Sequence, residues 1–130
     1  MEFDFKGQTA LVAGGTRGIG RAISEAFLKA GAKVVATYLS NDDEAKKFKQ
    51  ANADRAKFLD IHQFNVTDYE SVENFYKEVE GKYQGFQILV ISSGIRSDSI
   101  VGMMKEEDWN KVIDTNLTGT FNLSKLAVQS

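Results

Sequence analysis

Short apolar runs alternate with stretches of helical periodicity along most of the chain. Four runs have the length and composition of β-strands, at residues 9–13, 33–38, 58–66 and 87–91. The last run is continuously apolar, which is typical of a strand covered on both faces in a parallel sheet. We therefore expect residues 87–91 to form a central strand.

Between and after these runs, apolar residues recur three and four positions apart, as on one face of an α-helix. Polar residues with capping-box spacing mark two of the helix starts. The pattern predicts a helix over residues 19–30, a polar helix from Asn41 to about Asn52, a third helix capped by Thr67 with Glu70, and a long helix from 106 to about 130.

Four βα units in a row predict an α/β fold with a doubly wound parallel sheet of the Rossmann type, in the strand order 3-2-1-4. We expect one dinucleotide-binding domain over residues 1–130. The sheet is incomplete, because it stops at its fourth strand with an apolar edge at 87–91 and an uncovered face on the last helix.

Composition fits a globular domain that binds small molecules or protein. The 130 residues are 42% hydrophobic and 26% charged, and the formal net charge is −2 with no basic stripe. This balance argues against nucleic acid and membrane partners. No secretory signal or apolar span precedes the first strand, so we expect a cytoplasmic protein. The chain has no Cys and a single His62, so we expect no metal site.

A glycine cluster follows the first strand, with Gly14, Gly18 and Gly20 in the spacing G-x-x-x-G-x-G. Glycines at a strand-to-helix turn let backbone N–H groups approach a phosphate at a helix start. The spacing matches neither G-x-G-x-x-G nor the P-loop, so the cluster alone also fits a turn that needs small residues.

Three other segments lie at the carboxyl ends of the predicted strands, where ligands bind in doubly wound sheets. They are Tyr38, Asn65 with Val66, and Ser92 to Gly94. Their convergence with the glycine cluster on one crevice favours dinucleotide binding over a structural turn.

Four motifs, in order, resemble those of the short-chain dehydrogenase/reductases. They are Gly14–Gly20, Asn65–Asp68, Met104–Trp109 and Asn116–Gly119. Within the family they look most like the bacterial 3-oxoacyl-[acyl-carrier-protein] reductases. The resemblance implies NADPH-dependent reduction of 3-oxoacyl-[acyl-carrier-protein] in fatty acid biosynthesis. An acetoacetyl-CoA reductase, a polyketide ketoreductase, and a non-catalytic nucleotide-binding or scaffold module remain alternatives.

The resemblance also implies roles for individual residues. Asn116 would help to hold the active-site geometry, as a member of the catalytic set. The residues that would bind the cofactor are Gly14, Thr16, Arg17, Gly18, Ile19 and Gly20 at the pyrophosphate and adenosine ribose, Asn65 and Val66 at the adenine, and Ser92, Ser93 and Gly94 along the cofactor.

The residue at the end of the second strand influences whether NAD or NADP binds. An acid there would accept a hydrogen bond from the ribose 2′-hydroxyl and repel a 2′-phosphate. This chain has Tyr38 at that position and Arg17 beside the loop. A guanidinium forms strong bonds with phosphate, so we expect NADP, and Tyr38 joins the cofactor-binding residues. The alternative for Arg17 is a solvated surface cation.

Two departures from the family pattern stand out. Ile91-Ser92-Ser93-Gly94 replaces the usual Asn-Asn-Ala-Gly, and the family's active-site Ser and Tyr-x-x-x-Lys pair, which follow the long helix, are not in these 130 residues. We therefore expect the chain to bind cofactor without turning over, and to be part of a longer protein rather than one completed by a second copy. The last helix is placed like the family's dimer helix, which implies a homo-oligomer.

Overall fold

The computed structural model describes residues 3–129 as one parallel sheet between two helical layers. The strand order is β3-β2-β1-β4 and every pairing is parallel, which confirms the predicted order. In chain order the elements are β1 (Thr9–Ala13), α1 (Gly18–Lys29), β2 (Lys33–Tyr38), α2 (Asp42–Ala51), the 3₁₀ helix η1 (Ala53–Phe58), β3 (Leu59–Gln63), α3 (Tyr69–Tyr83), β4 (Ile88–Ile91), the 3₁₀ turn η2 (Val101–Met103), α4 (Glu106–Ile113), the π-helical turn η3 (Asp114–Thr118) and α5 (Gly119–Gln129).

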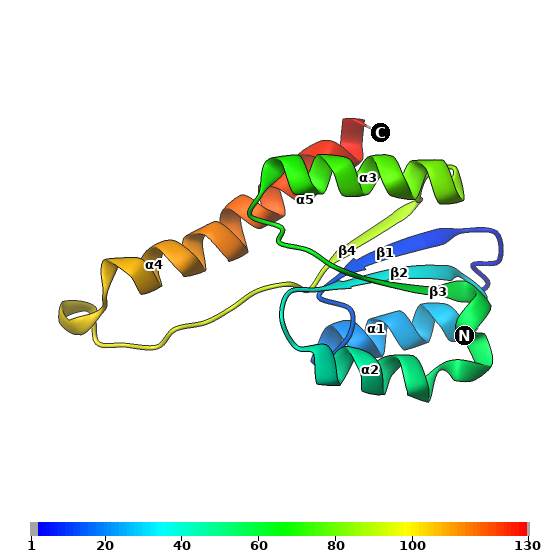
Figure 1. Ribbon diagram of the computed structural model, residues 1–130, viewed down its shortest axis with the longest axis horizontal. Helices are drawn as coiled ribbons and strands as arrows, with labels where there is room; N and C mark the ends of the chain where they lie inside the picture. The colour runs from blue at the N-terminus through cyan, green and yellow to red at the C-terminus, as the bar shows by residue number, and fades with distance from the viewer. Residues whose placement is uncertain (1–2, 130) are drawn as a thin grey trace.

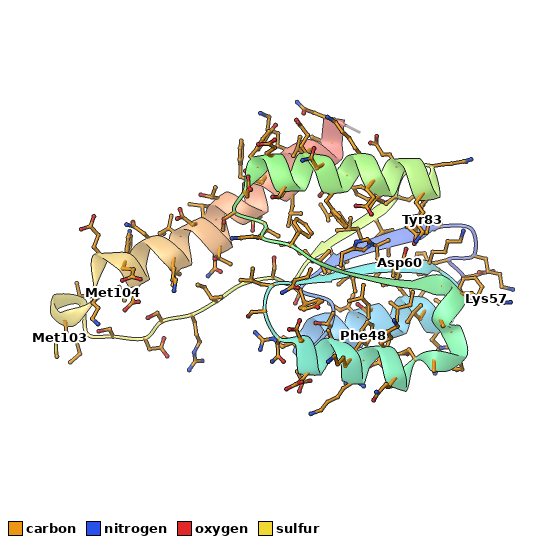
Figure 2. The ribbon with its side chains drawn as sticks, in the orientation of Figure 1. Phe48, Lys57, Asp60, Tyr83, Met103 and Met104 are labelled. Carbon is orange, nitrogen blue, oxygen red and sulfur yellow. The ribbon has the colours of Figure 1, made fainter. Side chains whose placement is uncertain are left out.

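Helices α1 and α2 cover one face of the sheet, and α3 and α5 cover the other (Figure 1). Successive residues of β1 face opposite sides, so each face has its own core. Leu11 packs with α3 and α5, whereas Val12 packs with α1 and with Phe48 of α2, which lies between α2 and the sheet (Figure 2). All five residues of β1 are buried, so β1 is the central strand of the fold.

Of the two expectations for residues 87–91, the apolar edge is confirmed, and the central strand is wrong for the described sheet. β4 lies at the edge of the described sheet, paired with β1 alone, and all four of its residues are half-buried. Its apolar run has another cause. Leu89 and Ile91 pack on the core under α3, and Val90 packs on the core over α1. Both faces are therefore covered although one edge is not.

Two other expectations need correction. β3 is shorter than the apolar run at 58–66, because Phe58 ends the 3₁₀ helix η1 and the strand stops at Gln63. Asp68, not Thr67, caps α3: its Oδ1 accepts from the Glu70 N–H at 3.2 Å. Thr67 instead donates its hydroxyl to Asn65.

The predicted long helix runs without a break from 106 to 129 and contains a π-helical turn, η3, between α4 and α5. Residue 130 lies outside the described part of the chain. Together with the loop before it, α4 projects away from the sheet, with Met103 near the far tip (Figures 1 and 2). Large apolar side chains on this arm and on the outer side of α5 are exposed, among them Trp109, Leu117, Phe121 and Val128. Among residues 3–129, no helix is long and apolar enough to cross a membrane.

Candidate cofactor-binding site

The glycine loop is held against two strand ends. The N–H groups of Gly14 and Gly15 both donate to the Thr37 carbonyl, at 3.0 and 3.1 Å. Gly14 has φ +75°, and a Cβ there would lie 2.7 Å from the backbone nitrogen of Ser93. This close approach of loop and β4 end requires glycine. A Cβ at Gly18 would instead meet nothing within 4 Å, so the loop is open on that side.

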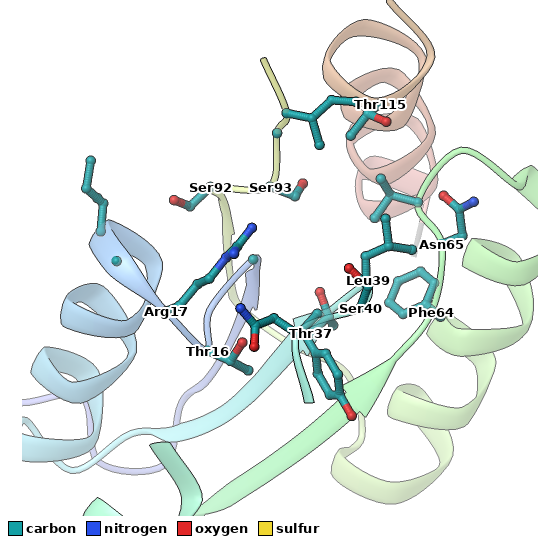
Figure 3. A pocket seen from close by; sticks show the side chains of 18 residues that line it. Thr16, Arg17, Thr37, Leu39, Ser40, Phe64, Asn65, Ser92, Ser93 and Thr115 are labelled. Carbon is teal, nitrogen blue, oxygen red and sulfur yellow. The ribbon is translucent and has the colours of Figure 1, made fainter. Parts of the chain in front are cut away.

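In the described part of the chain, no side chain caps the first turn of α1. Arg17 is its N-cap and gives no side-chain hydrogen bond, and the turn contains no acidic residue. Unpaired N–H groups and the helix dipole together attract an anion. Arg17 extends into the adjoining cavity (Figure 3), and within residues 3–129 its guanidinium forms no ion pair. The start of α1 is therefore suited to a phosphate.

A cavity of about 360 Å³ opens at the carboxyl ends of all four strands. It brings together all the residues predicted for the cofactor except Gly20. Sequence reasoning missed further lining residues: Thr37, Leu39, Ser40, Asn41, Phe64 and Ile95, which lie at or soon after strand ends, and Thr115 in η3. For all of them but Thr115, the position next to a strand end was the signal that would have found them.

Gly20 has a packing role next to the cavity. A Cβ at this position would overlap the carbonyl oxygen of Gly14. Gly20 thus lets α1 start directly against the loop, and its predicted contact with the cofactor stays a prediction.

Asn116 lies in η3 and binds the backbone that follows β4. Its Oδ1 accepts from the Ile95 N–H at 2.9 Å, and its Nδ2 donates to the Ile95 carbonyl at 2.8 Å. A Cβ at Gly94 would come within 3.1 Å of the same Oδ1. Asn116 is not itself part of the cavity lining. It fixes the loop that forms one wall, and π-helical turns often occur where a functional side chain must be placed.

The opposite wall is held by α5. Asn122 is 3% exposed, and its Nδ2 donates to the Val66 carbonyl at 3.0 Å. At Gly119 a Cβ would lie 2.6 Å from Val66 Cγ2, so the helix packs directly on this wall. Beside it, Asn65 accepts hydrogen bonds from the backbone and hydroxyl of Thr67, at 3.0 and 2.8 Å. Sequence reasoning did not identify Asn122, because a single polar residue in an apolar helix has no periodic signal.

Tyr38 is the last residue of β2 and lines the cavity. Its hydroxyl donates to Asp42 Oδ1 at 2.9 Å, across the turn into α2. This hydrogen bond, together with smaller contributions from desolvation and the Asp42 charge, raises the pKa of the Tyr38 phenol. The phenol therefore remains protonated through the neutral range, and it stays a donor to Asp42.

The family model for short chain dehydrogenases matches residues 8–130. The chain belongs to the short-chain dehydrogenase family. A crystal structure of a short-chain dehydrogenase/reductase, glucose/ribitol dehydrogenase, from Brucella melitensis superposes with a TM-score of 0.89 and 29% identity over 99% of this chain and 54% of that one. The resemblance inferred from the motifs is thus confirmed at the level of the family and the fold.

Two curated members of the short-chain dehydrogenase family show how far the likeness extends. Acetoacetyl-CoA reductase from Shinella zoogloeoides is 41% identical over 117 residues, which are 90% of this chain and 46% of that protein. The 3-oxoacyl-[acyl-carrier-protein] reductase FabG of Escherichia coli K12 is 38% identical over 127 residues, 98% of this chain and 50% of that protein. The chain spans about half the length of these relatives.

Proposed function

We propose that this chain is the cofactor-binding part of an NADPH-dependent reductase that converts a 3-oxoacyl thioester, carried on acyl carrier protein, to the 3-hydroxyacyl form in fatty acid biosynthesis. The names of the relatives support an acyl thioester substrate, since one acts on acetoacetyl-CoA and another on 3-oxoacyl-[acyl-carrier-protein]. The observation that carries the proposal is the open first turn of α1, with Arg17 beside it, facing a cavity shared by four strand ends.

The residues of the cavity fit a dinucleotide. The N–H groups of the first turn of α1 would hold the pyrophosphate, Val66 would lie at the adenine, and Ser92 to Gly94 would line the path toward the reacting end. Asn116 would keep that path in place through its two bonds to Ile95. NADPH would supply a hydride when bound, and the residues that line this cavity would orient its nicotinamide end.

These 130 residues bind the cofactor without completing the reaction, in our proposal. Reduction of a ketone needs a proton donor beside the hydride, which contributes roughly 10²–10⁴-fold to the rate. The family's donor is a Tyr with Lys four residues later, and none of Tyr38, Tyr69, Tyr76 and Tyr83 has such a Lys.

Arg17 is the proposed source of NADP preference. It lines the cavity and forms no ion pair with any residue from 3 to 129, and charge-assisted bonds from a guanidinium to a 2′-phosphate are strong. We expect Arg17→Ala to weaken NADPH binding about tenfold and NADH binding much less, measured by titration calorimetry. Lys29→Ala, a cation at the far end of α1, is the matched control. An unchanged NADPH-to-NADH affinity ratio in Arg17→Ala would refute the NADP assignment.

Acetoacetyl-CoA reduction is the second candidate, and the 41% identity to such an enzyme favours it. A non-catalytic nucleotide-binding module is the third. One assay of NADPH absorbance distinguishes the three candidate functions. In it, acetoacetyl-CoA and acetoacetyl-[acyl-carrier-protein] are offered in turn to the protein that carries these residues. Oxidation with the carrier protein alone supports our proposal, and binding without oxidation of either substrate supports the module.

The exposed apolar face of α4 and α5 supports a homo-oligomer. Trp109 is 57%, Leu117 65% and Phe121 57% exposed, and an apolar patch of this kind usually marks an interface. Light scattering tests this point, and a strict monomer at all concentrations would contradict it.

A further inference from the structure

A small polar pocket at the edge of the cavity holds opposing charges. Arg17, Ser40, Asn41, Asp42 and Asp43 line it, so one guanidinium shares the pocket with two carboxylates. Arg17 and the two residues Ser40 and Asn41 also line the larger cavity. A phosphate that binds Arg17 here is therefore close to acidic side chains, which repel it.

Asp42 differs from Asp43 in being tethered. The Tyr38 hydroxyl donates to its Oδ1 at 2.9 Å, and the raised pKa of the phenol keeps this donor protonated. The bond occupies one carboxylate oxygen. It joins the end of β2, where an acid selects for the ribose 2′-hydroxyl in dinucleotide folds, to the first residue of α2.

We propose that Asp42 is the residue that limits the preference of this site for a 2′-phosphate, and that Tyr38 moderates it by holding one of its oxygens. The inference rests on the proposed cofactor site and deepens it. A free carboxylate both repels a 2′-phosphate and accepts a hydrogen bond from a 2′-hydroxyl, so it shifts the balance toward NAD. Arg17 and Asp42 thus act in opposite directions on the same group of the ligand.

The test uses two nucleotides that differ only in the 2′-phosphate, adenosine 2′,5′-bisphosphate and 5′-AMP, with affinities measured by titration calorimetry. Asp42→Asn should raise the bisphosphate-to-AMP affinity ratio about two- to fivefold, the range for a single exposed charge interaction. Glu44→Gln is the matched control. The substitution removes one negative charge from the same helical turn, and Glu44 lines neither pocket. Glu44→Gln should change the logarithm of the bisphosphate-to-AMP affinity ratio by less than half of the change that Asp42→Asn produces.

Tyr38→Phe tests the tether. Without the phenol, Asp42 is free to bind the ribose hydroxyl or Arg17, and either contact lowers the ratio. Tyr38→Phe should therefore lower the ratio about twofold in the wild-type background and leave it unchanged in the Asp42→Asn background. An equal effect in both backgrounds would overturn the role of the tether.

Failure of this inference is distinguishable from failure of the proposed function. If Arg17→Ala lowers the ratio and Asp42→Asn leaves it unchanged or lowers it, the site stands and the role of Asp42 is wrong. The same holds if Glu44→Gln raises the ratio as much as Asp42→Asn does. If neither nucleotide binds the wild-type chain, both the proposed function and the inference are wrong.

Discussion

The first turns of α1 and α2 follow neighbouring strands and enter the same edge of the sheet, yet their chemistry is opposite. α2 is satisfied internally: Asn41 Oδ1 accepts from the Glu44 N–H at 3.1 Å, and three acids occupy the first turn. α1 has neither a side-chain cap nor an acid. The first turn of α2 is capped by its own side chains, whereas the first turn of α1 is open to an external anion. The binding site therefore lies at the helix start that lacks stabilising caps and charges.

Substitutions in the loop that leads into α1 should have the largest effects on stability and nucleotide binding. A Cβ at Gly14 would lie 2.7–2.8 Å from backbone atoms of Ser92 and Ser93, and φ is +75°. We expect Gly14→Ala to lower the free energy of unfolding by about 2–3 kcal/mol, in urea denaturation, and to abolish nucleotide binding. Gly81→Ala is the control, because a Cβ in this part of α3 meets nothing within 4 Å. It should stabilise the chain by about 0.5–1 kcal/mol. Equal losses at both positions would contradict the close approach.

Giving α1 an acid makes its start resemble that of α2. Ile19 is 77% exposed in the first turn and lines the cavity. Ile19→Asp should improve the helix by about 0.3–1 kcal/mol through the dipole, yet weaken ADP and NADPH about tenfold by repelling the pyrophosphate. Ile19→Asn controls for the loss of the apolar side chain. The stability measured by thermal unfolding should therefore rise, while the nucleotide affinity measured by calorimetry should fall. A loss of both stability and affinity would count against the anion site.

The smallest effect on binding is expected at the capped helix. Asn41→Ala removes the side-chain cap of α2 and should cost about 1 kcal/mol of stability. Asn41 also lines the cavity, but its Oδ1 is engaged with Glu44, so ADP affinity should fall less than twofold. Denaturant titration and calorimetry on the same samples measure both quantities. A tenfold loss of ADP affinity would show that α2, rather than α1, carries the phosphates.

Periodic patterns predicted the sheet because each βα unit carries its own signal, and handedness fixes the strand order. The cavity followed, since parallel strands end on one edge. Features that depend on one residue against a distant backbone could not be predicted. The π-helical turn at 114–118 breaks no apolar period. Its Asn116 was named from the family resemblance, but no pattern predicted its two hydrogen bonds to Ile95. In the same way, Asn122 acts through Val66.

Backbone amide NMR can show whether the open first turn of α1 binds the cofactor's phosphates. During a titration with NADPH, we expect the largest chemical-shift changes on the amides of residues 15–20, with smaller changes at Val66 and Ser93. Shifts concentrated on the first turn of α2, with residues 15–20 unmoved, would contradict this expectation.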